Sequence, residues 1–361
     1  MPNVSPFWDA IASGMQSRRP SVARAQVAQS HGPANVARMS AALPDPVLAY
    51  QPGIYPRSER VVAATRGLER GRVTQAEVDG AYREDLDDFV QVQKQARLDF
   101  FSDGLLRWQD IFRPLAHAAG VPARILTRWF DNNAFFRAPE LETPLGSRDV
   151  ILDAIVPDGS VPLPRVGTLP SPYMFSRAAA THADRNQLML DIARDVLQPA
   201  ARVLAGAGCR LIHLQEPWVG FFGIEGGDVA PFERALAALG DGVDAGIVLH
   251  VYYGDAGRFA DWLRRLPVHA VGVDLVETDL AALGTGWEVG LMAGCVDGRS
   301  SIVEDEERTA ELVRQVAETV QPPVLYVSSS SDLELLPRDV ARLKVQCLGG
   351  AVRRLTQPVA P

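Results

Sequence analysis

Eight short apolar runs recur along the chain, each separated from the next by a longer stretch with helical spacing. Strands this short and apolar suit a parallel sheet that is buried on both faces. Their alternation with helices indicates repeated βα units, and eight strands are the number that closes a barrel with a filled interior. The runs span residues 47–50, 98–102, 165–169, 211–215, 246–251, 270–275, 288–293 and 324–327.

The stretches between these runs carry the signals of helix ends. Residues 74–95 open with Thr74 and have Glu77 three positions later, which is the spacing of a capping box. Residues 304–320 are amphipathic and acidic in their first turn, which suits the helix dipole. Pro337 stands early in another helical stretch, where its missing N–H is harmless. The sequence therefore predicts an α/β fold, a (β/α)8 TIM barrel.

The chain has 361 residues, and barrels of this class commonly form one domain at such a length. Residues 1–45 have weak periodicity and predict an N-terminal extension, while residues 46–361 predict the barrel. The second and third strands are joined by a long connection over residues 107–164. Its aromatic content favours an ordered lid over the barrel mouth; the alternative is helices and turns packed on the barrel's outside.

Charge and cysteine content limit which partners and which cellular compartment we expect. Lys and Arg total 36 against 44 Asp and Glu, a net charge of −8. The chain lacks a basic run with interleaved aromatics, so we expect neither nucleic acid nor a membrane surface as a partner. Three widely spaced cysteines indicate free thiols in a reducing compartment, and no apolar signal segment opens the sequence. These features predict a cytoplasmic protein with a small-molecule substrate.

Polar residues stand at the carboxyl ends of the predicted strands, where barrel enzymes place their chemistry. His250 is a candidate general acid or base, with Asp274 or Glu216 to orient it. Arg107 and Arg299 are candidates to hold an anionic substrate group. The candidate substrate-binding residues are Tyr55, Arg57, Asp103, Arg107, Gln215, Tyr252, Asp297, Arg299 and Ser331. The alternative is that these residues only pair with one another.

Three further features have open or structural interpretations. His213 is expected to face the helices as a structural histidine. Cys295 either compensates for a missing metal ligand or fills the core, and core filling is the commoner role of such a cysteine. The serines at positions 328–331 form either a polar nest for an anion or a solvated loop.

Seven segments in order along residues 46–356 resemble the cobalamin-independent methionine synthases, in particular their catalytic C-terminal barrel in its short single-barrel form. The most specific is Ser331-Asp332-Leu333-Glu334-Leu335-Leu336-Pro337-Arg338-Asp339-Val340-Ala341, because its last seven residues are long and distinctive. The others are Gly53-Ile54-Tyr55-Pro56-Arg57, Asp103-Gly104-Leu105-Leu106-Arg107, Ser171-Pro172-Tyr173-Met174-Phe175, Glu216-Pro217, His250-Val251-Tyr252 and Asp297-Gly298-Arg299-Ser300.

The resemblance implies a zinc ion that binds a substrate thiol and presents it as a thiolate nucleophile. The family's ligands are His, Cys, Glu and Cys, whereas the matching positions here are His250, Tyr252, Asp274 and Ser331. Three of the four differ, and protonated hydroxyls are poor zinc ligands. We therefore expect no metal bound in the family's manner. The cofactor stays open, including a harder metal on His250, Asp274 and waters.

The amino-acid site that the resemblance implies is altered as well. Gln215, Leu105 and Ile54 stand where the family holds homocysteine through two carboxylates and the first loop. A buried ammonium without a counter-charge is costly, so an amino-acid acceptor in that pose is disfavoured. Arg299 replaces a catalytic histidine and is better suited to clamp an anion.

Three functions remain open from the sequence. The first is a divergent barrel enzyme that performs methyl or alkyl transfer, or lyase chemistry, on a small anionic molecule without a zinc thiolate. The second is a genuine methyl donor–homocysteine S-methyltransferase that makes methionine with zinc. The third is a non-catalytic binding protein or subunit with a protein partner.

Overall fold

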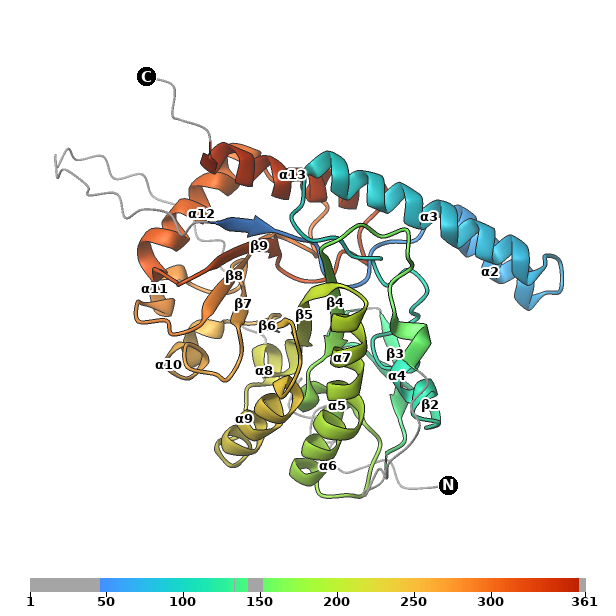
Figure 1. Cartoon of the computed structure of the whole chain (residues 1–361), viewed down its shortest axis with the longest axis horizontal. Helices are drawn as coiled ribbons and strands as arrows, with labels where there is room; N and C mark the ends of the chain where they lie inside the picture. The colour runs from blue at the N-terminus through green and yellow to red at the C-terminus, as the bar shows by residue number, and fades with distance from the viewer. Residues whose placement is uncertain (1–45, 133, 142–151, 357–361) are drawn as a thin grey trace. The chain divides into compact units, whose positions relative to one another are not determined.

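A computed structural model describes residues 46–132, 134–141 and 152–356 (Figure 1). The expected extension over residues 1–45 lies outside the described residues, as do Asn133 and residues 142–151 of the long connection. Among the described residues, no helix combines the length and the apolar character that crossing a membrane requires.

Seven parallel strands form one sheet in the order β1-β9-β8-β7-β6-β5-β4. Sequential strands β4 to β9 are neighbours, and β1 pairs with the last strand, as a closing barrel requires. The strands are β1 (Val47–Ala49), β4 (Arg165–Pro170), β5 (Cys209–Glu216), β6 (Gly246–Val251), β7 (Ala270–Asp274), β8 (Gly290–Val296) and β9 (Leu325–Ser329).

The eighth wall of the barrel is the segment around Phe100 and Phe101. Phe100 bridges Tyr50 in parallel, and Phe101 bridges Arg165, so this segment joins β1 to β4. The barrel is therefore closed as predicted, although the strand expected at residues 98–102 is reduced to two bridges. Its backbone is partly satisfied by a helix: the amide of Gln93 bonds both the N–H and the carbonyl of Ser102, at 2.8 and 2.9 Å.

The barrel interior is filled by one buried side chain from each of seven wall segments. Phe100, partly buried, packs against this cluster from the eighth. Alternate residues of a strand share a face, so the same phase continues toward the strand ends and selects the side chains that face the mouth. The cluster is Tyr50, Val166, Leu211, Val248, Ala270, Met292 and Tyr326.

Helices cover the outside of the strands (Figure 1). The capping box is confirmed, because Thr74 N–H donates to Glu77 at 2.7 Å and Glu77 N–H returns to the Thr74 hydroxyl at 3.3 Å. The helices are α2 (Glu59–Glu69), α3 (Gln75–Ala96), α4 (Arg113–Ala118), α5 (Pro172–Ala178), α6 (Arg185–Ile192), α7 (Gln198–Gly206), α8 (Pro217–Phe222), α9 (Gly226–Gly240), α10 (Ala260–Leu263), α11 (Leu280–Leu283), α12 (Glu306–Val320) and α13 (Arg338–Thr356), with short turns η1 (Leu152–Ile155), η2 (Ala193–Leu197) and η3 (Ala256–Phe259).

The long connection contains an antiparallel hairpin of β2 (Ala123–Arg128) and β3 (Phe135–Pro139). Phe130, at its turn, packs against Trp218 of α8 at 6.2 Å and against Tyr253 after β6 at 5.6 Å between ring centroids. The connection therefore includes an ordered element that contacts the loops at the carboxyl ends of β5 and β6.

Candidate active site at the barrel mouth

A pocket of about 260 Å³ opens at the carboxyl-terminal mouth of the barrel. Its walls come from the loop after β1, the segment before α4, the hairpin, the end of β5 and the loop after β9. Among the described residues that line it, three are acidic and none is basic. The lining is Ile54, Gln109, Asp110, Ile111, Trp129, Ala134, Phe135, Phe136, Gln215, Asp332, Glu334 and Leu335.

Asp332 and Gln215 form the polar centre of this pocket. The amide nitrogen of Gln215 donates to the Asp332 carboxylate at 2.5 Å, and the backbone N–H of Ile54 also bonds this carboxylate. Burial raises the pKa of Asp332 to about 7, while the Gln215 hydrogen bond lowers it. Without a cation to offset burial, the carboxyl group is held close to its titration point at neutral pH.

A glycine makes room for this arrangement. Gly53 has a φ of +75°, and a Cβ placed there would lie 1.7 Å from the Asp332 carboxylate oxygen. A side chain at position 53 would thus meet both the strain of the left-handed region and a direct clash. The glycine of the first loop is therefore required for the Gln215–Asp332 contact.

Gln215, which lines the pocket, has one acceptor without a hydrogen-bond donor among the residues that the structure describes. Its Oε1 atom is buried and has no hydrogen-bond partner within the described part of the chain. The orientation of the amide is fixed, because a flip would turn its oxygen toward the carboxylate of Asp332. A buried acceptor without a donor is costly, so this atom marks a place where a ligand or water donates.

The two other carboxylates of the pocket already have partners. Glu334 pairs with Arg57 at 3.3 Å. Asp110 accepts the backbone N–H groups of Phe112 and Arg113 at 3.0 and 2.8 Å, and the Arg113 guanidinium lies 3.1 Å from it. Arg57, a predicted substrate-binding residue, is therefore engaged with Glu334 at the pocket's edge.

His250 lies on β6, one strand away from Gln215 and in register with it. Its side chain is buried, and its Nε2 atom has no hydrogen-bond partner among the described residues. Burial, together with the neighbouring His213, lowers the pKa of His250 well below its ordinary value. The ring is therefore neutral at physiological pH and is a weak base there.

The expectation that His213 faces the helices is wrong. Positions 213 and 215 are two apart on one strand and so share a face. The Tyr50 hydroxyl lies 3.1 Å from Nδ1 of His213 in the barrel interior, and the His213 ring is 5.1 Å from that of His250. Burial lowers the pKa of His213 to about 3.

Asp274 and Arg299 belong to an ion network at the ends of β7 and β8. Arg299 contacts Glu277 at 2.7 Å and Asp274 at 3.6 Å, and its backbone N–H donates to Asp297 at 2.8 Å. Burial raises the pKa of Asp274 to about 6, and Arg299 lowers it. The Arg299 guanidinium also lies over the Tyr253 ring, 5.4 Å from its centroid. Arg299 is thus neutralised by Glu277 and Asp274.

Glu216 is bound to helix starts and is not held beside His250. Its carboxylate accepts the N–H of Val219 at 2.9 Å, the N–H of Met174 at 3.1 Å and the hydroxyl of Ser171. It therefore caps α8 and helps to cap α5, on the helix side of the strand. The prediction that it orients His250 is wrong, because the one-residue step from Gln215 turns the side chain to the opposite face.

The zinc-ligand positions of the family do not form a thiolate-type site here. Burial raises the pKa of Tyr252 well above its ordinary value, and the Ser331 hydroxyl makes a weak 3.5 Å contact with the carbonyl of Asp332. Asp274 is held by backbone N–H groups and Arg299. The described residues contain no group of three His, Cys, Asp or Glu arranged to hold a metal. The donor set lacks the two thiolates of the family's zinc site.

Cys295 does not supply the missing sulfur. Its thiol is buried and directed at the carbonyl of Ser328 at 3.8 Å, and burial raises its pKa far above the ordinary value. The serine run is also engaged internally: Ser328 donates to the Tyr50 carbonyl at 2.9 Å, and the Ser330 hydroxyl accepts the Gly298 N–H at 3.2 Å. Neither feature presents a free group to a ligand.

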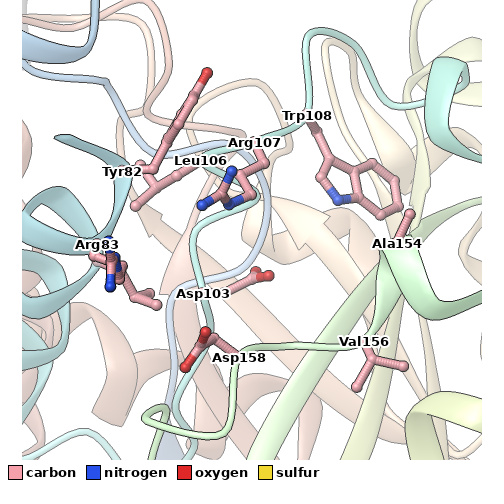
Figure 2. A pocket seen from close by; sticks show the side chains of 10 residues that line it. Tyr82, Arg83, Asp103, Leu106, Arg107, Trp108, Ala154, Val156 and Asp158 are labelled. Atoms are coloured by element: carbon pink, nitrogen blue, oxygen red, sulfur yellow. The ribbon is translucent and has the colours of Figure 1, made fainter. Parts of the chain in front are cut away.

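Asp103 and Arg107 line a separate pocket of about 210 Å³ (Figure 2). Asp103 accepts the N–H of Leu105 at 3.0 Å, and Arg107 pairs with Asp79 of α3 at 2.8 Å. Tyr55 does not line the mouth pocket and stacks on Phe89 with ring centroids 4.0 Å apart. Arg107 and Arg299 are therefore not brought together, because they contact different elements and each is paired with an acid.

Asp110, Asp332 and Glu334 are the acidic lining residues that were not among the sequence candidates. Asp332 and Glu334 stand in the Ser331–Ala341 segment that most resembles the family, one and three positions after Ser331. The signal available in the sequence was two acids in a loop after a strand, but nothing there showed that Gln215 and Gly53 meet Asp332. Trp129 and Phe136, by contrast, come from the connection in which a lid was expected.

The matching family model is described as the N-terminal domain of the cobalamin-independent synthase and covers residues 105–321, more than half of the chain. The chain therefore belongs to the cobalamin-independent synthase family. The motifs in the sequence resemble the family's C-terminal barrel, whereas the matching family model describes its N-terminal domain.

Individual relatives agree with this assignment. A methionine synthase of Sulfolobus acidocaldarius is 24% identical over 305 residues, which are 81% of this chain and 87% of the relative. A 5-methyltetrahydropteroyltriglutamate–homocysteine methyltransferase of Herpetosiphon aurantiacus is 29% identical over 231 residues, 61% of this chain and 30% of the relative. The solved structure of a B12-independent methionine synthase from Shewanella sp. W3-18-1 shares the fold, with a TM-score of 0.67 at 17% identity, covering 87% and 98% of the two chains.

Proposed function

We propose that the chain is an enzyme of the transferase kind that acts on a small molecule at the barrel mouth without a metal-activated thiolate. The observation that carries the proposal is the Asp332 carboxyl group in the pocket, with a pKa near 7 and only neutral hydrogen-bond donors around it. A group with a pKa near the working pH is suited to general acid–base chemistry.

The reaction that fits is transfer of a methyl or alkyl group to an acceptor that carries a proton. The Asp332 carboxylate takes this proton while the acceptor forms its new bond to carbon and the donor's bond to carbon breaks. Proton removal next to a leaving group, as in a lyase, would use the same carboxylate. Asp332 replaces His250 as the proposed proton carrier, because burial leaves the imidazole a weak base.

A zinc-dependent synthesis of methionine is the alternative that the relatives' names favour. The residues at the family's ligand positions do not support it, since one histidine and one carboxylate remain and that carboxylate is engaged with Arg299. An anionic substrate is also not supported by the pocket, because its charged lining residues are acidic. We therefore expect a small substrate that does not carry a negative charge.

Metal analysis of the purified protein, combined with an assay for methionine formation, tests the metal-free route. We expect less than 0.1 equivalent of zinc per chain and no methionine from homocysteine and 5-methyltetrahydropteroyltriglutamate, with or without added zinc. One equivalent of zinc with zinc-dependent methionine formation would establish the alternative.

Complementation of a deletion strain separates an enzyme from a binding protein. We expect Asp332→Asn, an isosteric change, to abolish complementation while circular dichroism shows an intact fold. The matched control is Asp158→Asn, at another acid that lines the separate pocket shown in Figure 2, and this variant should complement fully. Full complementation by Asp332→Asn would favour the non-catalytic alternative.

A further inference from the structure

The mouth pocket offers acceptors without matching donors. The Gln215 oxygen is buried and unpartnered, and it lies on the same amide whose nitrogen bonds Asp332 at 2.5 Å. Asp332 adds carboxylate oxygens that receive N–H groups from Gln215 and Ile54 but lie in no ion pair within the described residues. A ligand that satisfies this site has to donate hydrogen bonds to two neighbouring acceptors.

The charge of the pocket points in the same direction. Asp110, Glu334 and Asp332 line it, and no basic residue does so among the described residues. Arg113 and Arg57 neutralise the first two from outside the lining. Asp332 is the acid left without a counter-charge, and a buried carboxylate gains most from a cation placed against it.

The remaining walls are mostly apolar and carry three aromatic side chains. Trp129, Phe135 and Phe136 line the pocket from the hairpin, and Trp129 is held edge-on against Phe136 with ring centroids 5.7 Å apart. Aromatic faces accept both planar ligands and cations.

We propose that this pocket recognises a planar, positively charged N–H donor group of the amidinium or guanidinium class, bound between the Asp332 carboxylate and the Gln215 oxygen and covered by the hairpin aromatics. The inference rests on the proposed function in taking this pocket as the substrate site. It adds the chemical class of the group that the substrate presents there. Amidinium and guanidinium groups suit the site because their N–H donors diverge in one plane and meet two acceptors at once.

Three isosteric probes test the proposal: benzamidinium is cationic, benzamide is neutral and benzoate is anionic. Isothermal titration of the full chain at pH 8 should show benzamidinium binding at least tenfold more tightly than benzamide, with no detectable binding of benzoate. Equal binding of the three, or tighter binding of benzoate, would overturn the proposal on the unaltered protein.

Two variants test whether the preference for benzamidinium over benzamide arises in this pocket. Asp332→Asn should weaken benzamidinium at least tenfold and leave benzamide within about threefold, because the lost interaction is with charge. Gln215→Leu should weaken both probes, since it removes an acceptor. Asp158→Asn is the control and should leave all three affinities unchanged; an unchanged benzamidinium-to-benzamide ratio in Asp332→Asn would refute the site.

The affinity for the cation should also depend on pH. The carboxylate must be ionised to hold the cation, so affinity for benzamidinium should rise from pH 6 to pH 8 in the unaltered chain and stay flat in Asp332→Asn. These titrations need neither turnover nor metal. They can therefore fail while the zinc and complementation tests succeed, and the reverse holds as well.

Discussion

The two sides of the barrel mouth treat buried carboxylates in opposite ways. On the paired side, at the ends of β7 and β8, Asp274 lies 3.6 Å from Arg299, which also holds Glu277. On the open side, between β5 and the loop after β9, Asp332 receives N–H groups from neutral donors such as Gln215. Burial raises the pKa of both acids, to about 6 for Asp274 and to about 7 for Asp332.

The difference indicates which side of the barrel mouth can still bind a ligand. On the paired side, the guanidinium already supplies the charge that a ligand would bring, so the carboxylate is part of the structure. On the open side no such charge is present, and an acceptor of Gln215 is left over as well. A polar residue at a strand end is therefore a stronger candidate for function when its charge or its hydrogen-bonding atoms have no partner within the protein.

The largest expected effect on stability comes from adding a methyl group at position 53, beside Asp332 on the open side. Gly53→Ala places a Cβ where the Asp332 carboxylate lies, at a φ of +75°, and should lower the free energy of unfolding by about 3 kcal/mol, from left-handed strain plus displacement of the acid. Gly71→Ala is the control, with a φ of +64° and no atom within 4 Å, and should cost about 1 kcal/mol. Urea unfolding measures both; equal losses would show that the contact with Asp332 is unimportant.

The hairpin that lines the mouth pocket on the open side gives the next effect. Phe130→Ala removes ring contacts with Trp218 and Tyr253, and should cost about 2 kcal/mol and speed proteolytic cleavage of the hairpin. Leu126→Ala, at a side chain 60% exposed on the same hairpin, should change stability by less than about 0.5 kcal/mol. Cleavage rates that match between the two variants would mean that the turn is not anchored at the mouth.

Breaking the paired side should have a smaller effect. Arg299→Gln leaves Asp274 with two backbone N–H donors and no cation, which should cost about 1 kcal/mol in urea unfolding at pH 8 and move the pKa of Asp274 further upward. Benzamidinium affinity should stay unchanged. Arg210→Gln, which breaks an exposed pair with Asp244, should have no measurable effect on stability. A loss of benzamidinium binding in Arg299→Gln would erase the distinction between the two sides.

The smallest effect is a change in the pH dependence of stability. The pKa of Asp332 is raised from 3.8 to about 7, so the folded state binds its proton more tightly than the unfolded state. The resulting stabilisation is complete below pH 4 and is lost as pH rises through 7. Asp332→Asn should remove this loss and leave the variant about 1 kcal/mol more stable than the unaltered chain at pH 8, relative to pH 5. A fully buried acid would give roughly 3 kcal/mol over this range, and solvent screening of the partly exposed Asp332 reduces the effect.

The unfolding of both proteins from pH 4 to pH 9 tests this sign. Glu216 and Asp274 also have raised pKa values and contribute the same slope to both proteins, so the difference between the curves isolates Asp332. Asp244→Asn, at a side chain 97% exposed, should give the unaltered curve. Parallel curves for Asp332→Asn would contradict the raised pKa.

The sequence by itself determined the barrel, because strand and helix signals are local. Residues 246–251 were predicted as a strand and are one, and the capping box of Thr74 and Glu77 formed as the spacing required. Gln215 was also placed correctly at the mouth. Only the strand around Phe100 was reduced, where Gln93 of a neighbouring helix satisfies the backbone of Ser102.

The tertiary structure alone decided which polar residues are free. Arg299 was expected to bind an anion but is neutralised by Glu277 and Asp274, and Glu216 caps a helix. Asp332 became the centre of the site because Gln215, 117 positions away, donates to it. Hydrogen bonds and ion pairs form within 3 to 4 Å between segments far apart in the chain, so local patterns carry no record of which partners will meet.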